Sequence, residues 1–290
     1  MTSENELPDI SDDALALARR ALDEDGPYDV TSELVGAAGV QASAVLEYRS
    51  GGVVAGSAYA DAVAKLSDCG PLHWATTDGD VVPAGCVLAT LTGDLAKILY
   101  AERTLLNFLQ RACGIATATR AFVDALEGTG CQVLHTRKTA PGLRVFDVYA
   151  VLAGGGGQHR ISLASAVLVK DNHWHVLERG KTSLRAACDA ARTRGVAGIF
   201  VEVENLYQVR TACEAGATRL LVDNQDLLEF KKLATAAREA RPDVEIEATG
   251  GMTLDTARAY AESGAGFLSV GGLTHSVVAA DVALEITASG

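Results

Sequence analysis

A repeated unit after residue 130 constrains the fold more than any other feature of this sequence. Short apolar runs end in a polar residue and are followed by helical segments; the runs are CQVLHT, SAVLVK, GIFVEVE, RLLVDN, VEIEAT and GFLSVG. Near-continuous apolar runs that alternate with helices are typical of parallel strands buried on both faces. The repeat therefore predicts a parallel β/α barrel or a doubly wound sheet.

The residues at the ends of these runs favour the barrel. A barrel gathers the ends of its strands around one mouth, where the active sites of such barrels lie. Here the strand ends carry cations, carboxylates and hydroxyls, namely Arg137, Lys138, Lys170, Glu202, Asp223, Thr249 and Ser269. Solvated loops are also polar, but they rarely combine cations and carboxylates in one set, so we predict an active site at this mouth.

The first hundred residues follow a different pattern. A predicted helix over residues 11–22 precedes short strand-like runs such as ASAVLEYRSGGVVAG and GCVLATLTG, which indicates an α/β domain with an antiparallel or mixed sheet. A long linking helix follows, with Arg103, Asn107 and Arg111 at steps of four on its polar face. We expect an N-terminal domain with this helix over residues 1–115, a barrel domain over residues 116–274, and a C-terminal helix over residues 275–290 that packs back on the N-terminal domain.

Composition excludes several classes of protein. A net charge of −12 argues against an extended nucleic-acid surface, which needs a broad basic patch. The sequence contains neither a run of 18 apolar residues nor a secretory signal pattern, so we expect a cytoplasmic protein that does not bind membranes. The six cysteines form no CxxC pair, and His173 and His175 lack companion ligands, so neither a zinc site nor a disulfide framework is expected.

A local cluster of cations in an acidic chain points to a small anionic ligand. Arg137, Arg160 and two lysines supply positive charge, and arginine adds planar two-pronged hydrogen bonding that suits carboxylates. Two carboxylates, Glu202 and Asp223, would repel a polyanion unless a divalent cation lay between them, so Mg²⁺ bridging protein and pyrophosphate is the simplest interpretation. The alternative is that these carboxylates form ion pairs with Lys138 and Lys170, and both states are compatible.

Glycines follow the last two strands. The segments ATGG (residues 248–251) and SVGG (residues 269–272) each open toward a helix, where backbone N–H groups and the helix dipole favour a phosphate. Either pair alone indicates only a turn, but two pairs at successive strand ends predict a phosphate site. The GGGG run at residues 154–157 is interpreted as a turn that positions His159 and Arg160.

Taken together, these segments resemble one enzyme family. ERTLLNFLQRACGIAT, TRKTAPGLR, YAVLAGGGGQHR, LVKDNH, VEVEN, LVDN, EATGG and SVGGLTHS occur in an order and spacing similar to those of quinolinate phosphoribosyltransferase, the decarboxylating nicotinate-nucleotide pyrophosphorylase. LDEDGPYDVTSE resembles an acidic segment near the amino terminus of the family. The resemblance covers most of the chain.

The resemblance implies a fold, an assembly and a reaction. The fold is an N-terminal α/β sandwich-like domain on a barrel of fewer than eight strands, in a homodimer whose sites face the partner's N-terminal domain. The reaction converts quinolinate and phosphoribosyl pyrophosphate, with Mg²⁺, into nicotinate mononucleotide, pyrophosphate and CO₂.

The resemblance also implies roles for individual residues. The two carboxylates of quinolinate would be held by Arg103, Arg137, His159 and Arg160. Substrate and the pyrophosphate donor would be contacted by Thr136, Lys138 and Lys170. Ribose and metal would be bound by Glu202 and Asp223, which with the two lysines form the predicted catalytic set. The 5′-phosphate would be held by Thr249, Gly250, Gly251, Ser269, Val270 and Gly271.

Several positions depart from the pattern of the family. Tyr28 replaces a glycine, His135 stands where many bacterial members have Asp, Asp147-Val148 replaces a Glu-Lys pair, and Ser165 stands where an acid is common. We favour neutral drift over a specialised enzyme for another pyridine carboxylate, because the residues expected to touch both substrates are retained. Two alternatives stay open: a homologue of the molybdenum-associated ModD-like branch, and a non-catalytic ligand-binding homologue.

Overall fold

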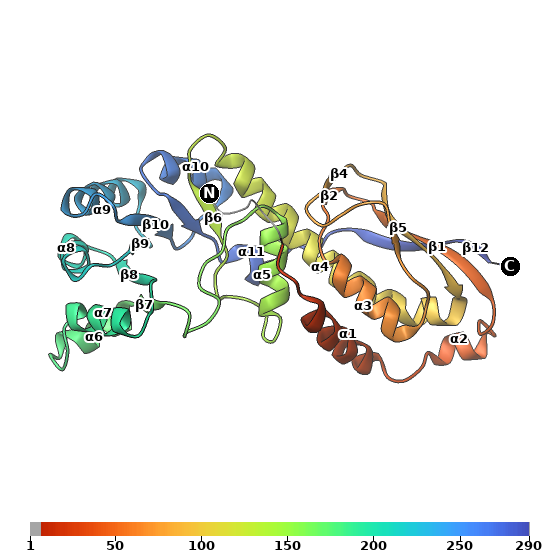
Figure 1. The fold of residues 1–290 in the computed structure, drawn as a ribbon. Helices are drawn as coiled ribbons and strands as arrows, with labels where there is room; N and C mark the ends of the chain where they lie inside the picture. Colours follow the sequence, from red (N-terminus) through yellow and green to blue (C-terminus); the bar gives the residue numbers. More distant parts are fainter. Residues whose placement is uncertain (1–6, 290) are drawn as a thin grey trace. The chain divides into compact units, whose positions relative to one another are not determined.

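Six parallel strands form the sheet that carries the predicted site. The computed structural model describes residues 7–289. The strands are β6 (Gln132–Leu134), β7 (Val167–Val169), β8 (Ile199–Val203), β9 (Arg219–Asp223), β10 (Glu245–Thr249) and β11 (Phe267–Ser269). Their order is β6-β11-β10-β9-β8-β7, so the first strand pairs with the last, while β6 and β7 are the two edges. This confirms an incomplete β/α barrel (Figure 1).

Helices connect these strands, and side-chain caps fix the starts of three of them. They are α6 (Asp171–Glu178), α7 (Leu184–Thr193), α8 (Leu206–Ala215), α9 (Leu227–Ala240), α10 (Leu254–Glu262) and the short α11 (Gly272–His275). The side chains of Ser183, Asn205 and Asp226 accept hydrogen bonds from backbone N–H groups in the first turns of α7, α8 and α9. The caps of α8 and α9 start these helices within a few residues of the ends of β8 and β9, so the connecting loops at this edge of the sheet are short.

A second, antiparallel sheet belongs to the N-terminal region. Its order is β12 (Val282–Ser289), β1 (Gln41–Tyr48), β5 (Cys86–Asp94) and β3 (His73–Trp74). A separate pair is formed by β2 (Gly52–Val53) and β4 (Val81–Val82). The helices of this region are α1 (Ser11–Asp25), α2 (Val30–Leu34) and α3 (Ser57–Ser67), and α1 and α3 pack side by side (Figure 1).

The predicted C-terminal helix is wrong, because most of this segment is the strand β12. It pairs with β1 from Tyr48 opposite Val282 to Ala42 opposite Ser289. Val282 and Leu284, two positions apart on one face of the strand, are buried, whereas Glu285 on the other face is exposed, so one face supplies core side chains. The edge of β1 offers this segment a full ladder of hydrogen bonds, which outweighs its short-range helical preference. The segment does return to the N-terminal sheet.

The linking helix α4 (Leu95–Ala125) is confirmed and contains 31 residues. The chain divides into two compact units, one of residues up to Arg120, Ala140–Gly155 and from Leu273 onward, the other of Ala121–Thr139 and Gly156–Gly272. The division differs from the predicted boundaries mainly because α5 (Arg144–Ala153) belongs to the first unit. A Cβ at Gly154, just after α5, would lie 2.4 Å from the carbonyl oxygen of Ala116 on α4, so only glycine permits this approach.

A buried ion pair joins α4 to α5 within the first unit. Arg111 donates from Nε and Nη2 to the two carboxylate oxygens of Asp147, at 2.9 and 2.8 Å. The Asp147 side chain is fully buried and also accepts a hydrogen bond from the backbone N–H of Ala140. Asp147, a departure from the family pattern, therefore has a structural partner in Arg111, and the adjacent Val148 is buried among apolar side chains.

Replacement of Arg111 by alanine is expected to lower the free energy of unfolding by about 3–5 kcal/mol, because it leaves the buried Asp147 carboxylate without its cation. Denaturant-induced unfolding followed by circular dichroism measures the loss. The matched control is Lys232→Ala, which breaks the more exposed pair with Glu229 and should cost less than about 1 kcal/mol. Equal losses in the two variants would contradict the assigned role of the Arg111–Asp147 pair.

Candidate active site

The register of the barrel strands aligns their ends at one edge. Asp223 pairs with Thr249, Thr249 pairs with Ser269, and Ser269 pairs with Leu134, the last residue of β6. The segment after His135, residues 136–139, therefore leaves the sheet beside the end of β11, and Lys170 follows β7 directly. The predicted gathering of polar strand ends at one mouth is confirmed for these residues.

One ion pair at the mouth joins two of the predicted catalytic residues. Lys170 Nζ lies 2.6 Å from Glu202 Oε1, so the pair that the sequence left as an alternative to metal binding is present. Burial raises the pKa of Glu202, and the negative charges of Asp223 and Asp171 raise it further, although Lys170 opposes them. The negative charge of Asp223 therefore acts on the Glu202 carboxylate.

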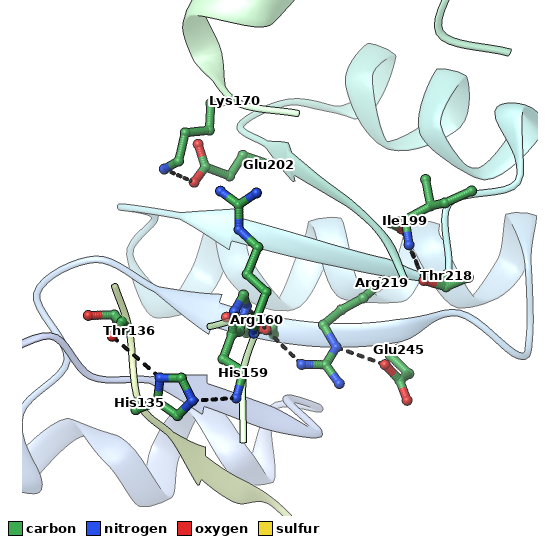
Figure 2. A network of polar contacts seen from close by, with 11 residues as sticks. His135, Thr136, His159, Arg160, Lys170, Ile199, Glu202, Thr218, Arg219 and Glu245 are labelled. Carbon is green, nitrogen blue, oxygen red and sulfur yellow. Dashed lines mark hydrogen bonds and ion pairs between the residues drawn. The ribbon is translucent and has the colours of Figure 1, made fainter. Parts of the chain in front are cut away.

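Two arginines face the same region. The Arg160 side chain extends toward the Lys170–Glu202 pair (Figure 2). Its Nη1 donates to the carbonyl oxygen of Ala166 at 3.2 Å. Burial and the positive charge of Arg137 lower the pKa of Arg160, whereas Glu202 opposes this shift. Arg137 Nε is buried without a hydrogen-bond partner among the described residues. Two neighbouring guanidinium groups with an unused buried donor are suited to an anion with planar carboxylates.

His159 is directed away from these arginines. Its Nδ1 accepts the backbone N–H of Arg160 at 2.7 Å, its Nε2 lies 3.5 Å from Glu247 Oε2, and its side chain is 7% exposed. The backbone N–H of His159 donates to His135 Nε2 at 3.0 Å (Figure 2). The structure thus places the imidazole ring among barrel residues, whereas the resemblance implied contact with a substrate carboxylate.

The glycine-rich ends of β10 and β11 differ from each other. Gly250 and Gly251 have φ of +86° and +61°, and a Cβ at Gly250 would lie 2.2 Å from Asn224 Oδ1, so glycine is required there. No atom lies within 4 Å of a Cβ built at Gly251, which leaves its backbone open. Val270 is buried, and its N–H donates to the carbonyl oxygen of Leu134, so Val270 supplies no donor to the predicted phosphate cup.

Arg103 belongs to the first unit, on α4. It is exposed, and it forms no hydrogen bond or ion pair with another residue in the described part of the chain. Thr136 is half-buried and its hydroxyl accepts the backbone N–H of Lys138, an exposed residue. Two further departures from the family pattern, Tyr28 and Ser165, are exposed.

Sequence reasoning missed a buried charged group inside the barrel. Arg219 donates to Glu245 Oε2 at 2.7 Å and to Glu247 Oε2 at 3.0 Å, and Glu247 has no exposed surface. Burial opposes ionisation of Glu247, but His159 and Arg219 keep its pKa below the ordinary value. The signal was visible in the runs RLLVDN and VEIEAT, where charged residues interrupt strands that otherwise read as buried.

The carboxylates at the mouth fit a divalent cation with few protein ligands better than they fit a transition metal. Within residues 7–289, no group of three or more His, Cys, Asp or Glu side chains is placed to hold a metal ion. Glu202 and Asp223 would supply two carboxylates, and substrate oxygens and water would complete the coordination, which is the usual arrangement for Mg²⁺.

Among the described residues, 7–289, no helix is both long and apolar enough to cross a bilayer.

Comparisons with known proteins agree with this geometry. The family model described as "Quinolinate phosphoribosyl transferase, C-terminal domain" matches residues 115–285, and the corresponding N-terminal domain matches residues 29–113. A probable nicotinate-nucleotide pyrophosphorylase [carboxylating] from Bacillus subtilis is 37% identical over 92% of this chain and 91% of its own length. A chloroplastic relative of the same name from Oryza sativa is also 37% identical, over 94% of this chain and 78% of its own length.

A solved structure shows the same fold. The nicotinate-nucleotide pyrophosphorylase from Francisella tularensis matches 99% of this chain and 100% of its own, with a TM-score of 0.88 and 32% identity. Because one relative is named chloroplastic, the cytoplasmic location of this chain stays a prediction. The two family models and these relatives together span nearly the whole sequence, so the chain belongs to the quinolinate phosphoribosyltransferase family.

Proposed function

We propose that this protein transfers the phosphoribosyl group of phosphoribosyl pyrophosphate to quinolinate, with loss of CO₂, and so makes nicotinate mononucleotide for NAD biosynthesis. One observation carries the proposal: Arg160 extends toward the Lys170–Glu202 pair, the charge of Arg137 acts on Arg160, and the charge of Asp223 acts on Glu202. The cluster brings cations for two anionic substrates next to carboxylates for a metal. The names of the relatives support the same reaction.

Quinolinate carries two adjacent carboxylates, and the arginines are suited to them. Each guanidinium can bind a carboxylate with two parallel hydrogen bonds. The buried Nε of Arg137 has no partner in the described protein, so a substrate oxygen would satisfy it. Lys138 and Thr136, which flank Arg137 in the sequence, are assigned to the same substrate.

The second substrate is assigned to the lysine and carboxylate side of the mouth. Lys170 would leave its resting pair with Glu202 and contact the pyrophosphate. Glu202 and Asp223 would hold Mg²⁺, which when bound neutralises charge on the departing pyrophosphate. Thr249, Gly250 and Gly251 with Ser269 and Gly271 would hold the 5′-phosphate near the start of α10.

The reaction needs positioning and electrostatic stabilisation rather than a protein nucleophile. The bond from ribose C1 to pyrophosphate breaks with its electron pair on the leaving oxygen, and the pyridine nitrogen attacks the cationic carbon. The nitrogen then carries positive charge, which stabilises the electron pair left on the adjacent ring carbon as CO₂ departs; a proton then adds to that carbon in place of the lost carboxylate. Cations fixed by the protein hold both anions together despite their repulsion.

The assembly is proposed to be a homodimer with shared sites. Arg103 is an exposed arginine that makes no polar contact with the rest of the described chain, as expected of a side chain that serves a second chain. We assign it to the quinolinate site of the partner subunit. The mixed-dimer experiment in the Discussion tests this assignment.

Incubation of the protein with quinolinate, phosphoribosyl pyrophosphate and Mg²⁺ is expected to yield nicotinate mononucleotide and CO₂, measured by chromatography and by release of labelled carbon. Excess EDTA should abolish turnover, and added Mg²⁺ should restore it, because Glu202 and Asp223 are assigned to the metal. Turnover undiminished by EDTA would contradict that assignment. Product from another pyridine carboxylate but none from quinolinate would move the protein to a specialised branch.

A further inference from the structure

Both ring nitrogens of His159 are already used by the protein. Nδ1 accepts the backbone N–H of Arg160, and in a neutral imidazole the other nitrogen then carries the proton. That nitrogen, Nε2, faces Glu247 Oε2 at 3.5 Å, which is a long contact, and the side chain is 7% exposed. This arrangement leaves no ring nitrogen for a substrate carboxylate.

Glu247 is held in turn by charge. Arg219 Nη1 donates to the same Oε2 at 3.0 Å, and Arg219 Nε donates to Glu245 on the same strand. The Arg219 guanidinium also lies 3.7 Å from the centre of the Phe267 ring, which fixes it further. Buried charges persist in an interior only when they are paired, so these contacts determine where the Glu247 carboxylate lies.

A second contact fixes the backbone of His159. Its N–H donates to His135 Nε2 at 3.0 Å, and His135 Nδ1 faces the carbonyl oxygen of Thr136 at 3.4 Å (Figure 2). Burial lowers the pKa of His135 to about 4, so this ring is neutral at ordinary pH and can accept that bond. Ring and backbone of His159 are therefore both anchored immediately before Arg160.

We infer that Glu247 is a positioning residue, which acts through His159 to fix the backbone of Arg160 so that its guanidinium is presented to the substrate carboxylate. Arg219 keeps Glu247 ionised and in place, and His135 anchors the neighbouring backbone. The inference rests on the proposed function, because Arg160 is the group that would touch quinolinate. His159 then contributes to substrate binding through Arg160 rather than by contact.

The kinetic test uses Glu247→Gln, which keeps the shape of the side chain and removes its charge. The KM for quinolinate should rise about tenfold, since small displacements of a binding group are costly, while the KM for phosphoribosyl pyrophosphate changes less than about threefold. The matched control is Glu245→Gln, which removes the other carboxylate on Arg219 without touching His159. In this control both KM values should stay within about twofold of wild type.

A measurement on the wild-type protein covers the case in which Glu247→Gln does not fold. Nitrogen-15 NMR of the histidine rings should show the Nε2–H tautomer for His159 and the Nδ1–H tautomer for His135. Addition of quinolinate should leave the His159 tautomer unchanged, since its ring does not touch the ligand.

Three results would overturn the inference: the Nδ1–H tautomer for His159, a doubly protonated His159 ring once quinolinate binds, or an unchanged KM for quinolinate in folded Glu247→Gln. Failure of the proposed function looks different, because the wild-type enzyme itself would then make no product from quinolinate. The tautomers of the free protein test the arrangement in either case.

Discussion

Replacement of Arg160 by alanine is expected to weaken quinolinate binding by about 2–5 kcal/mol, roughly 30- to 4,000-fold in Kd, the typical effect of removing one partner of a buried charge pair. Arg160 is half-buried, and its neighbour Arg137 has a buried donor without a partner among the described residues, so both guanidinium groups are suited to a bound carboxylate. Titration calorimetry with quinolinate measures the loss directly.

Two further variants separate charge from geometry at this position. Arg160→Lys keeps the positive charge but lacks the planar two-pronged donor, so its affinity should fall between those of wild type and Arg160→Ala. Arg194→Ala removes an exposed arginine at the end of α7 and should leave affinity unchanged. Wild-type affinity in a folded Arg160→Ala protein would refute the carboxylate-binding role.

Arg103→Ala and Lys138→Ala are each expected to reduce activity by about 100-fold or more as homodimers, because each removes a cation that stabilises the bound anions. If each site combines Lys138 of one chain with Arg103 of the other, a mixed dimer collects both defects in one site and neither in the other. Co-refolding equal amounts of the two variants should then restore about a quarter of wild-type activity, since half of the dimers are mixed and half of their sites are intact.

Native mass spectrometry provides the control for this experiment by showing that mixed dimers form. Refolding each variant alone should restore nothing. If mixed dimers are present and activity does not return, the site is not shared, and Arg103 is then a residue of its own chain or of the solvated face of α4.

The barrel and its mouth could be predicted because both follow from local patterns. The parallel strands are short and mostly apolar, and the polar residue that follows each apolar run must lie at the common edge of the sheet. Lys170, Glu202 and Asp223 were expected at this edge on this basis; Lys170 follows β7 directly, and Glu202 and Asp223 lie at or next to the ends of β8 and β9. The long helix α4 could be predicted equally well, since its apolar and polar residues keep helical spacing over many turns.

The strand β12 could not be predicted because its identity depends on a distant partner. Eight residues with moderate propensity for either structure become a strand only when the edge of β1, more than 230 residues earlier, is free to pair with them.

The assignment of α5 to the first unit also depends on a distant contact. The bidentate bond between Arg111 and Asp147, which holds α5 in the first unit, joins residues whose spacing carries no helical or strand period.

The orientation of His159 also depends on tertiary contacts. The motif GGGGQHR places a histidine and an arginine next to the barrel, but two adjacent side chains on an irregular segment can point in many directions. The parallel bridge between Leu134 and Gly157 and the hydrogen bond to His135 decide that the His159 ring turns toward Glu247. Neither contact has a signature in the local sequence.

The pairing of β12 with β1 has a consequence for biosynthesis. Roughly 190 residues separate β5 from β12, and a ribosome that adds about 5–20 residues per second needs roughly 10–40 s to make them. During that time one edge of β1 has no strand beside it and can pair with the wrong chain. The N-terminal region therefore reaches its native sheet only when β12 has left the ribosome, and an expressed fragment that stops after α4 keeps this open edge permanently.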